Sequence, residues 1–182
     1  MPDQACGRLS PWLRSKRINA VLPHLKGNIL DYGCGVGSLA GYCQPDQYLG
    51  LDVDAASLAV ARARYTGFRF ADTLSPAERF DTIVLLAVIE HLPSPEKTLS
   101  ELHAVLNVNG RIVLTTPHPL FHQFHRLGAI IGLFSIEASR QHHVLFDYQH
   151  MTLLADSAGF QTETFRSFLG GANQLFVLRA RP

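Results

Sequence analysis

The chain has 182 residues, 47% of them hydrophobic, which is enough for one sizeable core and predicts a single domain over residues 1–182. The formal net charge of +1 leaves no extended positive surface, so no DNA partner is expected. The 3 cysteines show no CxxC spacing and no signal peptide precedes them, which argues against a disulfide framework and favours the cytoplasm. The most continuous apolar stretch, residues 127–136, is about half the length that a transmembrane helix needs.

Strand-like and helix-like segments alternate along the chain, a pattern typical of a parallel sheet with helices on both faces. Ser10-Pro11 is a typical helix start and predicts an amino-terminal helix to about Leu22, within residues 1–27. Asp147 and Gly159 mark the start and the end of a late helix. The other predicted elements, in chain order, are strands at 28–32 and 47–51, a helix at 55–64, strands at 68–71 and 80–86, a helix from Ser94, and strands at 111–115, 161–168 and 173–179.

The first predicted strand runs into a glycine-rich turn, Ile29-Leu-Asp-Tyr-Gly-Cys-Gly-Val-Gly-Ser38, which a helix is expected to follow. Residues 35–40 also satisfy the G-x-G-x-x-A form of a dinucleotide fingerprint, and Asp52 and Asp54 stand at the end of the next strand to hold a ribose. A nicotinamide cofactor is therefore one interpretation. Asp31 argues against it, because its carboxylate would repel a pyrophosphate and favours a ligand that is cationic at this point. S-adenosylmethionine, with its sulfonium, α-ammonium and ribose diol, meets that requirement.

Further motifs follow the glycine-rich turn in order, and together they cover roughly residues 10–180. They are the acid that ends the second strand, the third-strand acid, the fourth strand with its Glu-His ending, the fifth strand and the late helix, at 50–52, 70–72, 80–91, 106–116 and 153–160. This series resembles the class I S-adenosylmethionine-dependent methyltransferases of types 11 and 12, including the quinone-biosynthesis O-methyltransferases. The resemblance implies an α/β, Rossmann-like, doubly wound sheet of seven strands in the order 3-2-1-4-5-7-6, with the last strand antiparallel and a lid inserted after strand five.

The resemblance also implies which residues hold S-adenosylmethionine. The glycines of the turn would let the backbone approach the methionine and ribose part of the cofactor. Asp31 would attract the ammonium group, Asp52 would accept both ribose hydroxyls, and Asp72 would accept from the adenine amino group. Asp31 as a turn cap and Asp72 as an ordinary loop acid stay open as alternatives. The full set expected at the cofactor is Asp31, Gly33, Cys34, Gly35, Gly37, Asp52, Val53, Asp72, Leu86 and Ala87.

The segment at 117–146, between the fifth strand and the late helix, is long for a plain connection and is predicted to be a lid over the acceptor. This segment and the end of the fourth-strand motif supply His118, His143 and His91, the candidates for contacting the acceptor or taking its proton. His91 as a turn-fixing residue and His143 as a tether of the lid are the alternative interpretations. The apolar part of the lid predicts an apolar acceptor or contact with a membrane surface.

A metal site is a further interpretation, since His118, His122 and His125 would share one face of a helix near the Glu-His pair at 90–91. RNA 3′-end ribose methyltransferases resemble the chain in such a cluster, but Ala87 replaces its first acid, so no metal is expected. The predicted function is methyl transfer from S-adenosylmethionine to a small-molecule, lipid or glycan acceptor, at oxygen. Metal-assisted RNA 3′-end methylation and a non-catalytic S-adenosylmethionine-binding module are the alternatives, and nothing in the sequence indicates the oligomeric state.

Overall fold

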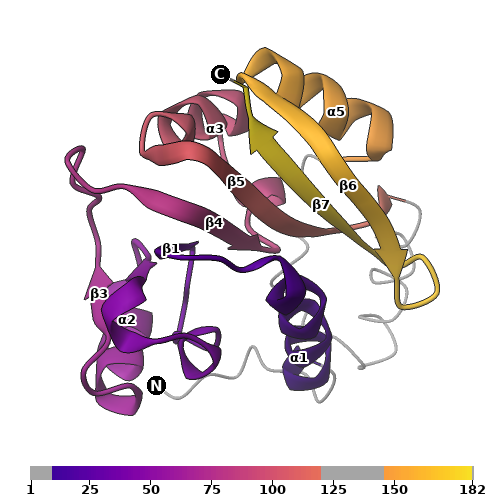
Figure 1. Cartoon of the computed structure of the whole chain (residues 1–182). Coiled ribbons are helices and arrows are strands. Elements are labelled where there is room, and N and C mark those ends of the chain that lie inside the picture. The colour runs from indigo at the N-terminus through magenta and orange to yellow at the C-terminus, as the bar shows by residue number, and fades with distance from the viewer. Residues whose placement is uncertain (1–9, 120–145, 182) are drawn as a thin grey trace.

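The structure, a computed structural model, describes residues 10–119 and 146–181. The strands in these ranges are β1 (Ile29–Tyr32), β2 (Tyr48–Leu51), β3 (Arg69–Ala71), β4 (Phe80–Leu86), β5 (Leu106–Pro117), β6 (Phe160–Phe168) and β7 (Asn173–Ala180). They form a seven-stranded sheet in the order β3-β2-β1-β4-β5-β7-β6 (Figure 1). β7 runs antiparallel to both of its neighbours, and the other neighbouring pairs are parallel. The predicted strand order and the antiparallel last strand are confirmed.

The α-helices of the described residues are α1 (Ser10–Val21), α2 (Ala55–Arg64), α3 (Pro95–His103) and α5 (Tyr148–Ser157), and they cover both faces of the sheet (Figure 1). α1 buries Ile18 against the face that carries Val84 of β4. α3 and α5 pack on the opposite face, against Ile83 and Leu85. Because successive side chains of a strand point to opposite faces, the alternating residues of β4 contribute to both cores.

Capping residues determine where two of the helices begin or end. The Asp54 carboxylate accepts hydrogen bonds from two backbone N–H groups at the start of α2. Asp147 accepts the N–H of His150 at 2.9 Å at the start of α5, and Gly159 follows that helix with a left-handed φ of 86°. The predicted start and end of the late helix are confirmed.

The prediction of a helix directly after the glycine-rich turn is wrong. Residues 33–39 form turns and no α-helix, and a short 3-10 helix, Ala40–Tyr42, follows them. Gly35 and Gly37 take φ values of 52° and 73°, which a right-handed helix excludes, and Pro45 ends the segment soon afterwards. The helix N-terminus that would bind a pyrophosphate is therefore missing at this turn, which removes the main structural support for the nicotinamide interpretation.

β5 is longer than the predicted strand at 111–115. The Asn109-Gly110 pair, interpreted from sequence as a turn before the strand, lies inside β5 instead. Asn109 keeps the left-handed φ of 64° that such a pair favours, and the register between β4 and β5 shifts between Phe80 and Thr82. The turn signal thus produces a bulge in a continuous strand, because pairing with β4 resumes on both sides of it.

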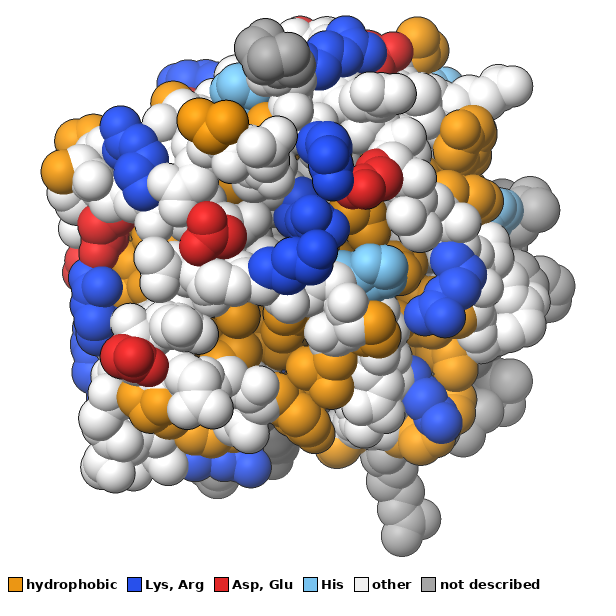
Figure 2. All heavy atoms as spheres, viewed as in Figure 1, with side chains coloured by type: hydrophobic (Ala, Val, Ile, Leu, Met, Phe, Trp, Pro, Cys, Tyr) orange, Lys and Arg blue, Asp and Glu red, His pale blue; other side chains and the backbone are white. Residues whose placement is uncertain are grey.

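The predicted lid lies almost wholly outside the described residues, and it stays a prediction. No helix in the described part of the chain is long and apolar enough to cross a membrane. On the face shown in Figure 2, basic side chains are interspersed with acidic and hydrophobic ones, in agreement with the formal net charge of +1.

Candidate functional site

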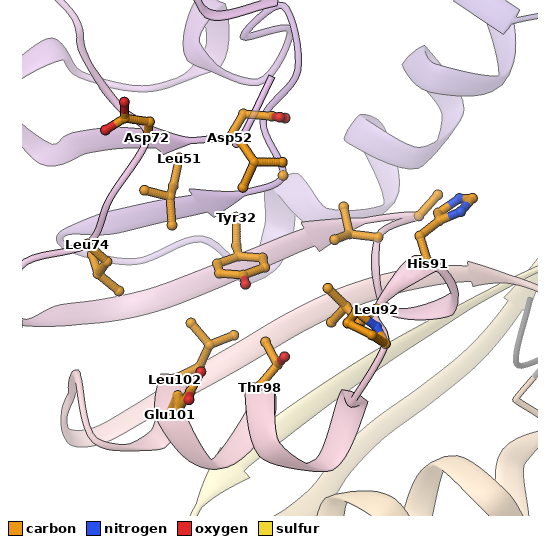
Figure 3. Close-up of a pocket in the computed structure, with 15 residues that line it drawn as sticks. Tyr32, Leu51, Asp52, Asp72, Leu74, His91, Leu92, Thr98, Glu101 and Leu102 are labelled. Atoms are coloured by element: carbon orange, nitrogen blue, oxygen red, sulfur yellow. The ribbon is translucent and has the colours of Figure 1, made fainter. Parts of the chain in front are cut away.

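A cavity of about 680 Å³ opens at the carboxyl ends of β1, β2 and β3, the edge where doubly wound sheets bind ligands. Figure 3 shows Tyr32 near its centre, with Asp52 and Asp72 on one side and Thr98 and Glu101 of α3 on the other. The connection from β3 to β4, residues 72–79, contains no helix, so that α3 bounds the cavity directly. Of the residues predicted at the cofactor, five line this cavity: Gly33, Asp52, Val53, Asp72 and Ala87.

The carboxylate of Asp52 is held in place by the backbone around it. Its Oδ2 accepts the N–H of Gly35 at 2.7 Å, and its Oδ1 accepts the N–H of Asp54 at 2.9 Å. Each oxygen keeps a further lone pair, so the oriented carboxylate can still accept two hydroxyl groups. The two hydroxyl groups of the S-adenosylmethionine ribose can supply these two hydrogen bonds.

The three glycines of the turn serve different purposes. A Cβ on Gly35 would have no heavy atom within 4 Å, so the backbone here lies open to a ligand. A Cβ on Gly33 would approach Val88 to 2.6 Å, and one on Gly37 would approach the Phe70 ring to 2.9 Å. Gly33 and Gly37 are therefore required by packing as well as by their positive φ, whereas Gly35 leaves space that a cofactor can fill.

Asp31 lies in the interior beneath the turn. It is 2% exposed, its Oδ2 accepts the hydroxyl hydrogen of Tyr48 at 2.7 Å, and it does not line the cavity. The pKa of this carboxyl is raised from 3.8 to about 7, chiefly by burial and also by the charge of Asp52, whereas the Tyr48 hydrogen bond lowers it. Contact between Asp31 and the cofactor ammonium stays a prediction.

The remaining residues predicted at the cofactor differ in position. Val53 is 92% exposed at the rim of the cavity, whereas Leu86 packs against the core on the α1 side. Cys34 is half-buried, and burial raises the pKa of its thiol, so it is an inert thiol there. Ala87 has a φ of 57°, a left-handed conformation that costs about 1–2 kcal/mol for a residue with a Cβ. Such strain at the wall of a cavity is typical of a binding site.

Two of the three candidate histidines, His91 and His118, lie within the described residues. His91 ends a 3-10 helix (Ile89–His91) and lines the cavity (Figure 3). His118 follows β5, where its backbone N–H donates to the carbonyl of Ala172 at 3.0 Å. His143 lies outside the described residues. A role in proton transfer stays a prediction for each of them.

The sequence did not predict that Arg17, Glu90, Thr116 and Asn173 would form one polar cluster. Thr116 donates its hydroxyl hydrogen to Glu90 at 3.2 Å, and Arg17 of α1 donates its Nε–H to Asn173 at 2.9 Å. Glu90, Thr116 and Asn173 are buried. The sequence marks Glu90 by its place after the fourth strand, but Arg17 and Asn173 carry no motif and are 156 residues apart.

The metal interpretation gains no support from the described residues. No group of three or more His, Cys, Asp and Glu side chains that could hold a metal ion occurs among them. His122 and His125, which the interpretation requires, lie outside the described ranges.

The sheet order, the glycine-rich turn and the acid that ends β2 together define a class I S-adenosylmethionine-dependent methyltransferase. Over residues 7–164 the chain matches the family described as "Methyltransferase domain", and it belongs to that family. S-adenosylmethionine is accordingly the methyl-donor cofactor, and the open backbone at Gly35 and the oriented carboxylate of Asp52 fit it.

Known relatives support the same family. A demethylmenaquinone methyltransferase from Symbiobacterium thermophilum is 28% identical over 139 residues, which are 63% of this chain and 55% of that protein. A ubiquinone biosynthesis O-methyltransferase from Rhodopseudomonas palustris is 31% identical over 127 residues, which are 63% of this chain and 47% of that protein. The matched region is thus about half the length of these relatives.

Solved structures share the fold. A magnesium protoporphyrin IX methyltransferase from Synechocystis with bound S-adenosylhomocysteine has a TM-score of 0.68 and 18% identity, covering 93% of this chain and 84% of that one. A methyltransferase from Haloferax volcanii, in complex with the Trm112 activator, has a TM-score of 0.73 and 16% identity, covering 94% of this chain and 90% of that one. The predicted fold class is confirmed by this likeness.

Proposed function

We propose that the protein transfers a methyl group from S-adenosylmethionine to an oxygen atom of a small-molecule acceptor. The observation that carries the proposal is the carboxylate of Asp52, which two backbone amides orient beside the open backbone of Gly35. A carboxylate so placed matches a ribose diol, and the cavity next to it extends to Ala87 and Val88 after β4, the edge of the sheet where an acceptor would lie.

The sulfonium of the cofactor supplies an activated methyl group and a good leaving group. The chain's own task is to bind, to orient and to exclude water, and such positioning can lower the barrier by several kcal/mol. An acceptor hydroxyl must also lose its proton. His91, which lines the cavity, and His118, which follows β5, are the described candidates for accepting it, and His143 is the candidate from the predicted lid.

The acceptor class is proposed from the relatives and from the sequence. The matched proteins are named for demethylmenaquinone and ubiquinone biosynthesis, which favours an aromatic or quinol-like oxygen acceptor here. Lipid and glycan acceptors belong to the same proposal. The apolar part of the segment at 117–146 favours an acceptor with apolar character or contact with a membrane surface, and the cysteine pattern favours the cytoplasm.

Calorimetric titration with S-adenosylhomocysteine, beside a titration with NADH, tests the cofactor assignment. We expect micromolar binding of S-adenosylhomocysteine, no binding of NADH, and no change after treatment with a chelator. Preference for NADH would show that the glycine-rich turn holds another ligand. Loss of binding after chelation would revive the metal-assisted alternative, and tight binding without methyl transfer to any catechol or quinol would indicate a non-catalytic binding module.

A further inference from the structure

α1 forms side-chain hydrogen bonds to two segments that follow or border the central strands of the sheet. Arg14 donates to the hydroxyl of Ser38, beyond the glycine-rich turn, at 3.4 Å. One turn later, Arg17 reaches Asn173 at the first position of β7. Asn173 pairs in register with Pro117, the last residue of β5, so Arg17 lies at the carboxyl end of β5, the edge of the sheet where doubly wound folds bind ligands.

Among the described residues, Arg17 uses only part of its hydrogen-bonding capacity. Its Nε–H bonds Asn173, but its two terminal amino groups have no hydrogen-bond acceptor among the described residues. Burial lowers the pKa of this guanidinium, and the nearby carboxylate of Glu90 opposes that effect. Glu90 forms no ion pair with Arg17 and accepts the Thr116 hydroxyl instead. A partly desolvated guanidinium whose terminal donors lack an acceptor, as these do within the described ranges, is costly unless an anion pairs with it.

The surroundings of Arg17 indicate which anion fits. The guanidinium fork presents parallel N–H groups that match a carboxylate or a phosphate. Glu90 influences Arg17 electrostatically and so already offsets part of its positive charge. A dianionic phosphate would meet more repulsion from Glu90 than a singly charged carboxylate would, so the surroundings favour a carboxylate.

We propose that Arg17, oriented by Asn173, recognises a carboxylate on the methyl acceptor, so that the acceptor is an acidic molecule. This inference rests on the proposed function, because it assumes that the acceptor occupies the crevice between the glycine-rich turn and the ends of β5 and β7. Arg17 then determines specificity: it selects the acceptor and orients its oxygen, and takes no part in proton transfer.

Calorimetry on the full chain saturated with S-adenosylhomocysteine tests the proposal. The probes are protocatechuate, a catechol that carries a carboxylate, and its neutral amide. We expect the carboxylate to bind about ten-fold or more tightly than the amide, as a charge-assisted hydrogen bond provides. Arg17→Gln should abolish this preference, and Arg17→Lys should retain part of it. Lys16→Gln, which removes a charge from the exposed side of the same helix, should leave the preference unchanged.

Two readouts separate the possible failures. Without binding of S-adenosylhomocysteine, the proposed function itself is wrong. With that binding intact, equal binding of the two probes, no binding of either, or an unchanged preference in Arg17→Gln would overturn the acidic acceptor. A structural role alone for Arg17 would lower the melting temperature of Arg17→Gln and leave the preference for the carboxylate in place.

Discussion

Asp52 is the single residue on which cofactor binding depends most directly. Asp52→Ala removes a charge-assisted acceptor of two hydroxyl groups, and we expect S-adenosylhomocysteine affinity to fall by about 2 kcal/mol or more in calorimetry. Asp54→Ser is the matched control, since it removes a carboxylate two positions later but keeps a residue that caps α2. If wild type and Asp52→Ala bound S-adenosylhomocysteine with equal affinity, Asp52 would not be the residue that binds the ribose.

Asp31 links the stability of the fold to pH. Its pKa is about 7 in the folded state against 3.8 as the ordinary value, because it is buried. Between these values the folded chain holds a proton that the unfolded chain has released. This carboxyl therefore stabilises the fold at low pH, and its contribution is lost as the pH rises from about 4 to about 7.

Asp31→Asn tests this linkage, because the amide resembles the protonated acid and does not titrate. We expect the melting temperature of the variant, relative to wild type, to rise as the pH increases from about 4 to about 7. Tyr48→Phe serves as a comparison that removes the hydrogen bond to Asp31 but keeps the carboxyl. Parallel pH profiles of wild type and Asp31→Asn would show that Asp31 titrates near its ordinary value.

Among the elements, the glycine-rich turn combines a binding role with a packing role. Gly35→Ala meets no neighbouring atom, so its cost is the left-handed φ, about 1–2 kcal/mol, and a methyl group in the space left for the cofactor. Gly37→Ala would meet Phe70 at 2.9 Å and Ala61 at 3.2 Å. We expect Gly35→Ala to lose S-adenosylhomocysteine affinity in calorimetry, and Gly37→Ala to lose more stability in thermal unfolding. The reverse order would mean that Gly37 is the residue nearer the cofactor.

The elements also show where local sequence signals fail. The alternation of strands and helices, and the capping residues Asp147 and Gly159, predict their elements well because they act within a few residues. The expected helix after the glycine-rich turn does not form, since its residues take positive φ. Asn109 takes the left-handed φ that an Asn-Gly turn favours, but the pair lies within β5, because cross-strand pairing outweighs the tendency to turn.

For the whole molecule, cofactor binding is expected to stabilise the fold by mass action. A ligand at about 100 times its dissociation constant stabilises the folded state by about 2.7 kcal/mol if it binds only that state. S-adenosylhomocysteine should therefore raise the melting temperature in a concentration-dependent way, and NADH should not. The shift should be much smaller in Asp52→Ala at the same ligand concentration. If the melting temperature of Asp52→Ala rose as much as that of wild type, the stabilising ligand would have to bind somewhere other than at Asp52.

The sequence by itself determined the order of the strands, through its resemblance to a family, and the positions of Gly35 and Asp52 at the ends of β1 and β2. The positions of Gly35 and Asp52 follow from periodicity and from residues next to one another in the chain, whereas the strand order is what the resemblance implies. The tertiary structure alone decided that Asp31 faces Tyr48 and that Arg17 meets Asn173, 156 residues later. No local propensity encodes such pairs, because side chains on different elements meet only after packing on the sheet has brought those elements together.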